Sequence, residues 1–264
     1  MAVNLIDGAP PVTEVGFSIG TLDSIIMDPF RASELHEAFS ADFPLVERRE
    51  PTQGLPIAAI VGSPPALLPS DLGVPPRWWF KSESDNEVLQ MQERFWSFNW
   101  RRNPFGSRPV EYPGYIDLRN RAESYAKRLC EWHTGRGNPE PVPASCELLY
   151  TDLIKVSQGR RLSDYFAFWK GDPSGGFRTA AFNLSWLEPV GDGDKGTLNV
   201  ALTHVSPVTE DFPDSVFFQV NFVAGSVVTS WDDTFEFFDL AHEAIRNRFE
   251  YMLTEEFKLS WNAK

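Results

Sequence analysis

The sequence predicts an α+β fold in which a twisted antiparallel sheet carries its helices on one face. Three observations support this class. Several segments alternate apolar and polar residues with a period of two, as half-buried strands do. Two long segments repeat apolar residues at steps of three and four, as amphipathic helices do. The order strand, helix, several strands, long helix also occurs twice, so we expect a single domain over residues 1–264 with pseudo-repeat halves 12–138 and 139–258.

The first half opens with a predicted strand over residues 12–19, where alternate residues are apolar. A helix is expected from Asp28-Pro29, because aspartate is a good N-cap and proline suits the first helical position. Its apolar face carries Leu35, Phe39 and Phe43. Residues 51–76 contain seven prolines. Regular elements do not tolerate so many prolines, so we expect an ordered loop there with one short strand at 57–61.

Two strand candidates follow, at residues 77–82 and 87–101, around the polar connection 83–86. A connection of this length and composition predicts a hairpin. The second arm is long, and its apolar residues change from odd to even positions near Arg94. A β-bulge at that point would account for the change of face, because one extra residue shifts the alternation.

The clearest helix of the chain starts after Tyr112-Pro113-Gly114 and is expected to end at Gly135, a residue that commonly terminates helices. Its apolar stripe consists of Tyr115, Leu118, Ala122, Tyr125, Leu129 and Trp132. Such a stripe on one side predicts that the helix packs one face on the sheet.

The second half repeats this order of elements without repeating the residues themselves. The predicted elements are strand 146–156, a short helix capped by Ser163, strands 177–187, 198–205 and 216–228, and a long helix from Trp231. Strands 177–187 and 198–205 flank a glycine-rich segment, which predicts an antiparallel pair. This repeated order is similar to the duplicated arrangement of TATA-binding-like and helix-grip folds, a similarity that implies nothing about function.

Several distinctive short motifs are spread across the chain. They are Gln90-Met91-Gln92 and Phe98-Asn99-Trp100-Arg101, Tyr112-Pro113-Gly114-Tyr115, Glu147-Leu148-Leu149-Tyr150, Pro10 to Val15, and Ala241-His242-Glu243 with Trp261. Together these motifs resemble those of a sporadically distributed bacterial family of uncharacterised proteins. The resemblance covers nearly the whole chain, although Thr151-Asp152 stands where the family pattern has an asparagine. It implies a bacterial, cytosolic, single-domain protein with no catalytic residues to transfer. The scattered occurrence of the family implies genes carried on mobile or defence islands.

Composition excludes several classes of protein. The 264 residues contain 24 Lys and Arg against 37 Asp and Glu, a net charge of -13 that disfavours binding to duplex nucleic acid. Hydrophobic residues make up 42% and aromatic residues 14%, which excludes a wholly disordered chain. No apolar run approaches a membrane span and the start lacks a basic segment followed by an apolar run, so we expect a cytoplasmic protein without a membrane partner.

The most distinctive polar side chains lie in the segment 87–101. In a regular strand Gln90, Gln92 and Arg94 point the same way, and Asn99 and Arg101 lie on the other face. The candidate residues for binding a ligand or partner are Gln90, Gln92, Arg94, Trp96, Asn99, Trp100 and Arg101. In the alternative interpretation, the polar members of this set hydrogen-bond to neighbouring backbone and join parts of the fold, as most buried polar groups do.

Signatures of catalysis and of metal binding are weak in this sequence. The four histidines are isolated, and His36-Glu37 and His242-Glu243 lack the second histidine that a helical zinc site needs. The two cysteines have neither disulfide-scaffold nor zinc-site spacing, and no serine sits in a Gly-x-Ser-x-Gly elbow. The glycine-rich segments do not match a phosphate-binding loop. We therefore predict no cofactor, no metal and no assigned catalytic residue.

Three functional hypotheses follow. The first is a non-enzymatic module that binds a protein partner or forms a homo-oligomer in a bacterial defence, toxin–antitoxin or stress system, because nine Trp and 21 Phe exceed the needs of one core and can line a contact surface. The second is a small-ligand-binding or hydrolytic protein that uses a crevice between sheet and long helices, with Gln90, Gln92 and Arg94 as anchors. The weakest is a single-stranded nucleic-acid binder, in which Trp96, Trp100 and Arg101 would contact the bases.

Overall fold

The structure is a computed structural model that describes residues 11–25, 29–51, 76–102, 110–156, 161–169, 183–191, 195–205 and 216–262. Within these ranges, one open sheet contains nine strands in the order β2-β3-β4-β5-β1-β6-β9-β8-β7, and every neighbouring pair is antiparallel. The strands are β1 (Val12–Thr21), β2 (Leu45–Arg49), β3 (Arg77–Lys81), β4 (Glu87–Gln92), β5 (Phe95–Arg101), β6 (Pro143–Val156), β7 (Asn183–Pro189), β8 (Thr197–Val205) and β9 (Val216–Val227).

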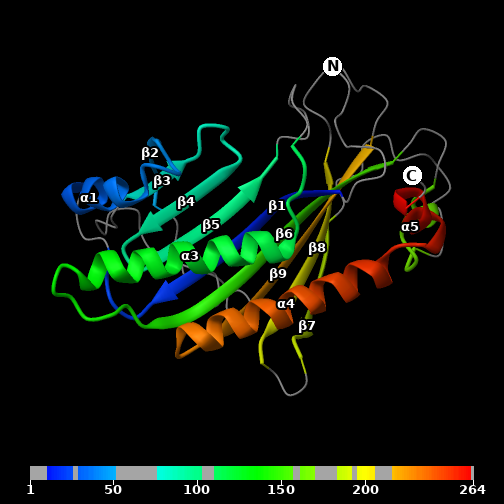
Figure 1. The fold of residues 1–264 in the computed structure, drawn as a ribbon. Coiled ribbons are helices and arrows are strands. Elements are labelled where there is room, and N and C mark those ends of the chain that lie inside the picture. The colour runs from blue at the N-terminus through cyan, green and yellow to red at the C-terminus, as the bar shows by residue number, and fades with distance from the viewer. Residues whose placement is uncertain are drawn as a thin grey trace.

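The two long helices lie on the same face of this sheet (Figure 1). The helices are α1 (Pro29–Phe39), α3 (Tyr115–Thr134), α4 (Trp231–Met252) and α5 (Glu255–Asn262). Phe17 of the central strand β1 shows how they pack, because its ring lies 6.0 Å from Tyr115 of α3 and 5.3 Å from Phe238 of α4. The main core therefore forms between the sheet and these helices, and we call the opposite side of the sheet the second face.

The order of strands explains why the sequence repeats its elements. In each half the first strand, β1 or β6, lies at the centre of the sheet, and the later strands return from the edge towards it. The two halves join where β1 and β6 pair, with Phe17 opposite Leu148. The predicted α+β class, with two similarly ordered halves and helices on one face, is confirmed.

The predicted single long strand over 87–101 is wrong. The chain reverses at Glu93-Arg94, so that Gln92 pairs with Phe95 and the segment forms two neighbouring strands, β4 and β5. A reversal exchanges the faces on which alternate residues lie, as a bulge would, and this explains the change in the apolar pattern. The irregularities in this part of the sheet lie in β1, where the register with β6 shifts between Val12 and Glu14 and again between Gly20 and Thr21.

Two predicted helices differ in the structure. The expected helix at Ser163 is only a 3-10 turn, η1 (Leu162–Asp164), and the buried Phe166 beyond it forms an isolated bridge with Leu253. Helix α1 ends at Phe39, so Phe43 enters the core from the following turn and not from the helix. The expected cap at Asp28 and the expected strand at 57–61 lie outside the described residues.

Candidate functional site

The seven residues that the sequence singles out do not form one site. Trp96 and Trp100 are 1% and 2% exposed and belong to the core on the helix side. Arg94 is exposed in the turn between β4 and β5. Gln90 lies opposite Ser97 and Trp79, on the second face of the sheet. The alternation of the strands places Gln92, Asn99 and Arg101 on that face as well.

Gln90 and Asn99 belong to a chain of hydrogen bonds that crosses four strands. Arg77 on β3 donates from Nη1 to Oε1 of Gln90 at 3.0 Å, and Gln90 donates from Nε2 to Oδ1 of Asn99 at 2.8 Å. Asn99 then donates from Nδ2 to Oε1 of Glu14 on β1 at 3.0 Å. Burial raises the pKa of Glu14, and the Asn99 bond and the charge of Arg101 offset part of that rise. This chain holds the Arg77 guanidinium in one position.

The side chain of Asn99 lies directly over a glycine of the central strand. A Cβ atom on Gly16 would approach Nδ2 of Asn99 to 2.6 Å, so only glycine leaves room for the amide there. Ser97 also donates to Oδ1 of Asn99, at 2.7 Å, and both residues are buried. The side chains of this polar network are therefore closely packed, and the hydrogen bonds of Gln90 and Asn99 link neighbouring strands of the sheet.

Next to this network, three arginines surround one tryptophan ring. The Cζ atoms of Arg49, Arg77 and Arg101 lie 4.6, 5.3 and 5.2 Å from the centre of the Trp79 ring. At these distances each guanidinium interacts favourably with the ring as a cation–π pair. We call the group that contains this ring and its charged neighbours the Trp79 surface; it consists of Glu47, Arg49, Arg77, Trp79, Lys81, Asp85 and Arg101.

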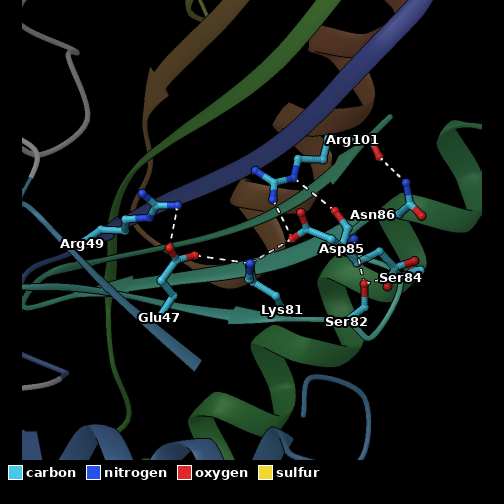
Figure 2. Close-up of polar contacts among 9 residues, drawn as sticks. Glu47, Arg49, Lys81, Ser82, Ser84, Asp85, Asn86 and Arg101 are labelled. Carbon is cyan, nitrogen blue, oxygen red and sulfur yellow. Dashed lines mark hydrogen bonds and ion pairs between the residues drawn. The ribbon is translucent and has the colours of Figure 1, made fainter. Parts of the chain in front are cut away.

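Ion pairs connect most of the charges of the Trp79 surface in one row (Figure 2). Glu47 lies between Arg49 at 2.8 Å and Lys81 at 3.3 Å, and Asp85 lies between Lys81 at 3.3 Å and Arg101 at 2.7 Å. Burial disfavours the charge of Asp85, but its bonds to Arg101 and Lys81 outweigh this and lower its pKa. Most of these side chains are a fifth to a half exposed, so the row is accessible to solvent.

Positive charge exceeds negative charge around Trp79, where the four cations Arg49, Arg77, Lys81 and Arg101 face the carboxylates of Glu47 and Asp85 and that of Glu14 opposite Arg101. Among the described residues Arg77 has no carboxylate partner, and it contacts Gln90 and the Trp79 ring instead. Its pKa is lowered by burial and by the neighbouring charge of Arg49. The result is a small cationic area on a chain whose net charge is -13.

Strand geometry brings these residues together. Arg77, Trp79 and Lys81 are alternate residues of β3 and share one face, and the pairing of β2 places Glu47 opposite Trp79 and Arg49 opposite Arg77. Sequence reasoning missed this surface because it did not predict β2. The alternation Arg-x-Trp-x-Lys from residue 77 was the available signal.

A second cluster of polar groups lies on the helix side of the sheet, where several of the family-like motifs meet. The hydroxyl of Tyr150 on β6 lies 3.2 Å from the hydroxyl of Tyr112 and 3.1 Å from Nδ1 of His242 on α4. The His242 ring stacks on Tyr115 at 3.8 Å, and Tyr115 donates to Asp239 at 2.7 Å. Burial, followed by the charge of Arg246, lowers the pKa of His242, so its ring is neutral at pH 7.

A buried acid lies on β6 two residues beyond Tyr150. Asp152 is 3% exposed, and its Oδ1 atom has no hydrogen-bond partner. Burial raises its pKa to about 7, against the opposing effect of Arg102 at the end of β5. Arg102 is buried as well, and the charge of Asp152 in turn raises the pKa of Arg102 against the effect of burial. A buried carboxylate oxygen without a hydrogen bond lowers the stability of the fold. Asp152 is therefore the best candidate for a functional acid on the helix side of the sheet.

Other candidate chemistry receives little support within the described ranges. No group of three or more His, Cys, Asp or Glu side chains is arranged to hold a metal ion there. Burial raises the pKa of Cys130 to about 12, so this thiol stays protonated at neutral pH and is a poor nucleophile. No helix in this part of the chain has the length and apolar character needed to cross a membrane.

Apart from the partly exposed Trp79, few of the abundant aromatic residues contribute to an exposed contact surface in the described residues. The large apolar side chains that are exposed there are aliphatic, apart from Tyr251, and include no Phe or Trp. Phe and Trp rings instead fill the space between the sheet and the helices. The core between the nine-stranded sheet and the two long helices is thus large enough to bury these Phe and Trp rings.

No protein-family model, curated protein or solved structure matches this chain.

Proposed function

We propose that the protein is a non-enzymatic interaction module that binds an acidic segment of a protein partner through the Trp79 surface. The observation that carries the proposal is the unbalanced charge around Trp79, where Arg77 contacts no carboxylate of the described residues. A partner's carboxylates would supply the missing negative charges. Trp and Arg side chains are also the residue types that contribute most to binding at protein interfaces.

The hydrogen-bond network behind the surface supports binding by fixing its geometry. Gln90 holds Arg77, and Asn99 in turn holds Gln90. A guanidinium that is already positioned loses less conformational freedom when it binds a carboxylate than a free side chain does. The predicted site residues Gln90, Asn99 and Arg101 thus support or form the proposed surface, although Arg94, Trp96 and Trp100 take no part in it.

A protein partner suits the surface better than nucleic acid. The two tryptophans expected to stack on bases, Trp96 and Trp100, are buried under the helices. The net charge of -13 also repels a long polyanion more strongly than a short acidic segment. A second copy of this acidic chain could supply the segment, and a defence or stress system of bacteria is the setting that the family resemblance implies.

Fluorescence anisotropy with a labelled hexaglutamate peptide tests the proposal. Arg77→Gln should weaken binding at least tenfold, since a hydrogen bond to a charged group contributes roughly 1.5–3 kcal/mol. The matched control is Arg246→Gln, which removes the same charge from an exposed position of α4, on the helix side of the sheet. We expect less than a twofold change for this control.

Three outcomes would contradict the proposal. They are an absence of peptide binding at low salt, equal weakening by the two variants, and tighter binding of a thymidine hexanucleotide than of the peptide. Light scattering after size-exclusion chromatography distinguishes a second copy from another protein as the partner. A dimer that Arg77→Gln dissociates and Arg246→Gln does not would identify self-association.

A second candidate function is the binding of a small polar ligand between the sheet and the long helices, and the unsatisfied Oδ1 of Asp152 favours it. The anchors would be Asp152 and Tyr112, because Gln90 and Gln92 lie on the other face. In a thermal-shift screen of nucleotides and free amino acids, a ligand at 100 times its Kd should add about 2.7 kcal/mol to the stability. Asp152→Asn should abolish that shift, and the exposed Asp232→Asn should preserve it. A shift that survives in Asp152→Asn, or none at all, would contradict this function.

A further inference from the structure

We infer that the acidic segment binds as a tenth strand, antiparallel to the outer edge of β2. This inference rests on the proposed function and adds the way in which the partner is held. β2 is the terminal strand of the sheet and pairs only with β3, from Leu45 opposite Lys81 to Arg49 opposite Arg77. In the described part of the chain no strand pairs with its other side. A terminal strand carries backbone N–H and C=O groups that can bond to an added strand.

The side chains of β2 are exposed on both faces of the sheet. Leu45 and Val46 point to opposite faces and are 45% and 46% exposed. Arg48 is exposed on the helix side, and Arg49 is exposed beside Trp79. β2 therefore offers an apolar pair at one end and a basic pair at the other, and an added strand can contact both pairs at once.

The opposite edge of the sheet lacks this combination. β7 reads Asn-Leu-Ser-Trp-Leu-Glu-Pro, so it contains one acid, no cation and a terminal proline. Its Glu188 also pairs with Arg248 of α4. An acidic segment would meet a like charge at β7, and the proline removes one N–H from that strand. Charge complementarity therefore selects β2 as the edge for an acidic partner.

The order of residues along β2 specifies the order along the partner. An antiparallel strand runs past Arg49 and Arg48 first, then Glu47, and finally Val46 and Leu45. Directly opposite side chains contact one another, so the partner should read acid, acid, any residue, apolar, apolar. The acid opposite Arg49 would lie on the second face, which carries the Trp79 surface. A parallel strand would require the reverse order.

Backbone methylation of a peptide separates strand addition from simple charge attraction. The probe is a labelled peptide with the central sequence Asp-Glu-Thr-Val-Leu, and the unmodified protein is used throughout. In an added strand, every second N–H group of the peptide points towards β2 and donates a hydrogen bond to it, and the remaining N–H groups point away. N-methylation of the first set therefore removes hydrogen bonds to β2, and N-methylation of the second set removes none. We expect at least a tenfold loss of affinity for one set and less than twofold for the other. The reversed sequence should bind at least fivefold more weakly.

Hydrogen exchange of the protein provides an independent readout. On saturation with the peptide, amides within residues 45–49 should exchange at least tenfold more slowly, and amides of β7 should not change. Equal effects of the two methylated peptides, or unchanged exchange in β2 at saturation, would overturn strand addition and leave the proposed function standing. Failure of every acidic peptide to bind would instead contradict the proposed function itself.

Discussion

Replacing Asp152 with asparagine is expected to stabilise the protein more at pH 8 than at pH 5. The side chain is 3% exposed, and burial raises its pKa from an ordinary value of 3.8 to about 7. Asparagine has nearly the same shape and carries no charge. The substitution therefore removes the cost of burying a carboxylate without opening a cavity.

The sign and size of the effect follow from the pKa difference between the folded and unfolded chain. An acid with a higher pKa in the folded protein opposes folding once it ionises in the unfolded chain. The cost is absent well below pH 3.8, grows between pH 3.8 and about 7, and is constant above that. At ~1.4 kcal/mol per pKa unit, it reaches about 4 kcal/mol at pH 8 and roughly 2 kcal/mol at pH 5. The stabilisation by asparagine should therefore be about 3 kcal/mol larger at pH 8, because the cost grows by ~1.4 kcal/mol for each of the two pH units between 5 and the folded pKa of about 7.

Urea unfolding followed by tryptophan fluorescence at both pH values measures this difference directly. Glu147→Gln is the companion variant, because Glu147 is also buried and burial alone raises its pKa to about 7, on the second face of the sheet. It should show the same sign. A change in the free energy of unfolding that is equal at pH 5 and pH 8 for Asp152→Asn, or a larger destabilisation at pH 8, would refute the reasoning.

Three further substitutions test the packing and the hydrogen bonds by urea unfolding. Gly16→Ala should lower the free energy of unfolding by about 1–3 kcal/mol, because its Cβ would displace the Asn99 amide; an unchanged midpoint would contradict the close packing. Tyr150→Phe removes the hydroxyl that joins Tyr112 and His242 and should cost about 1–3 kcal/mol, whereas a neutral effect would mean that water replaces it. Ser230→Ala removes the cap that accepts from the Asp233 amide at the start of α4 and should cost ~1 kcal/mol; no loss would show that the cap is dispensable.

Much of the fold could be predicted because its elements carry strong local patterns. The strands β8 and β9 and the helices α3 and α4 each bury mainly one side, so their apolar residues recur with the period of the element. β1 is buried on both faces, but its second face carries small and polar residues such as Gly16 and Ser18, so the alternation is still visible. β2 could not be recognised in the same way. Its side chains are exposed on both faces, and a strand without a buried side leaves no alternation in the sequence. The turn at Glu93-Arg94 was missed because it contains no glycine, asparagine or proline.

The candidate site depended on pairings that no local pattern records. Arg49, Arg77 and Arg101 come from β2, β3 and β5, and they meet at Trp79 only because β2 pairs with β3, β3 with β4 and β4 with β5 in one particular register. The sequence did identify Gln90 and Asn99 as unusual polar residues in a strand. It could not show that their hydrogen bonds run to Arg77 and Glu14, since those partners lie 13 and 85 positions away.

The central position of β1 has a consequence for synthesis on the ribosome. This strand is made first, yet its neighbours β5 and β6 begin at residues 95 and 143. Its apolar side chains therefore emerge long before either neighbour exists. Strand pairs between segments so far apart in the sequence form slowly, and an apolar strand that stays unpaired in the meantime is prone to aggregate. The nascent chain should accordingly depend on chaperones until β6 has left the exit tunnel, and chains truncated before residue 143 should accumulate as insoluble material.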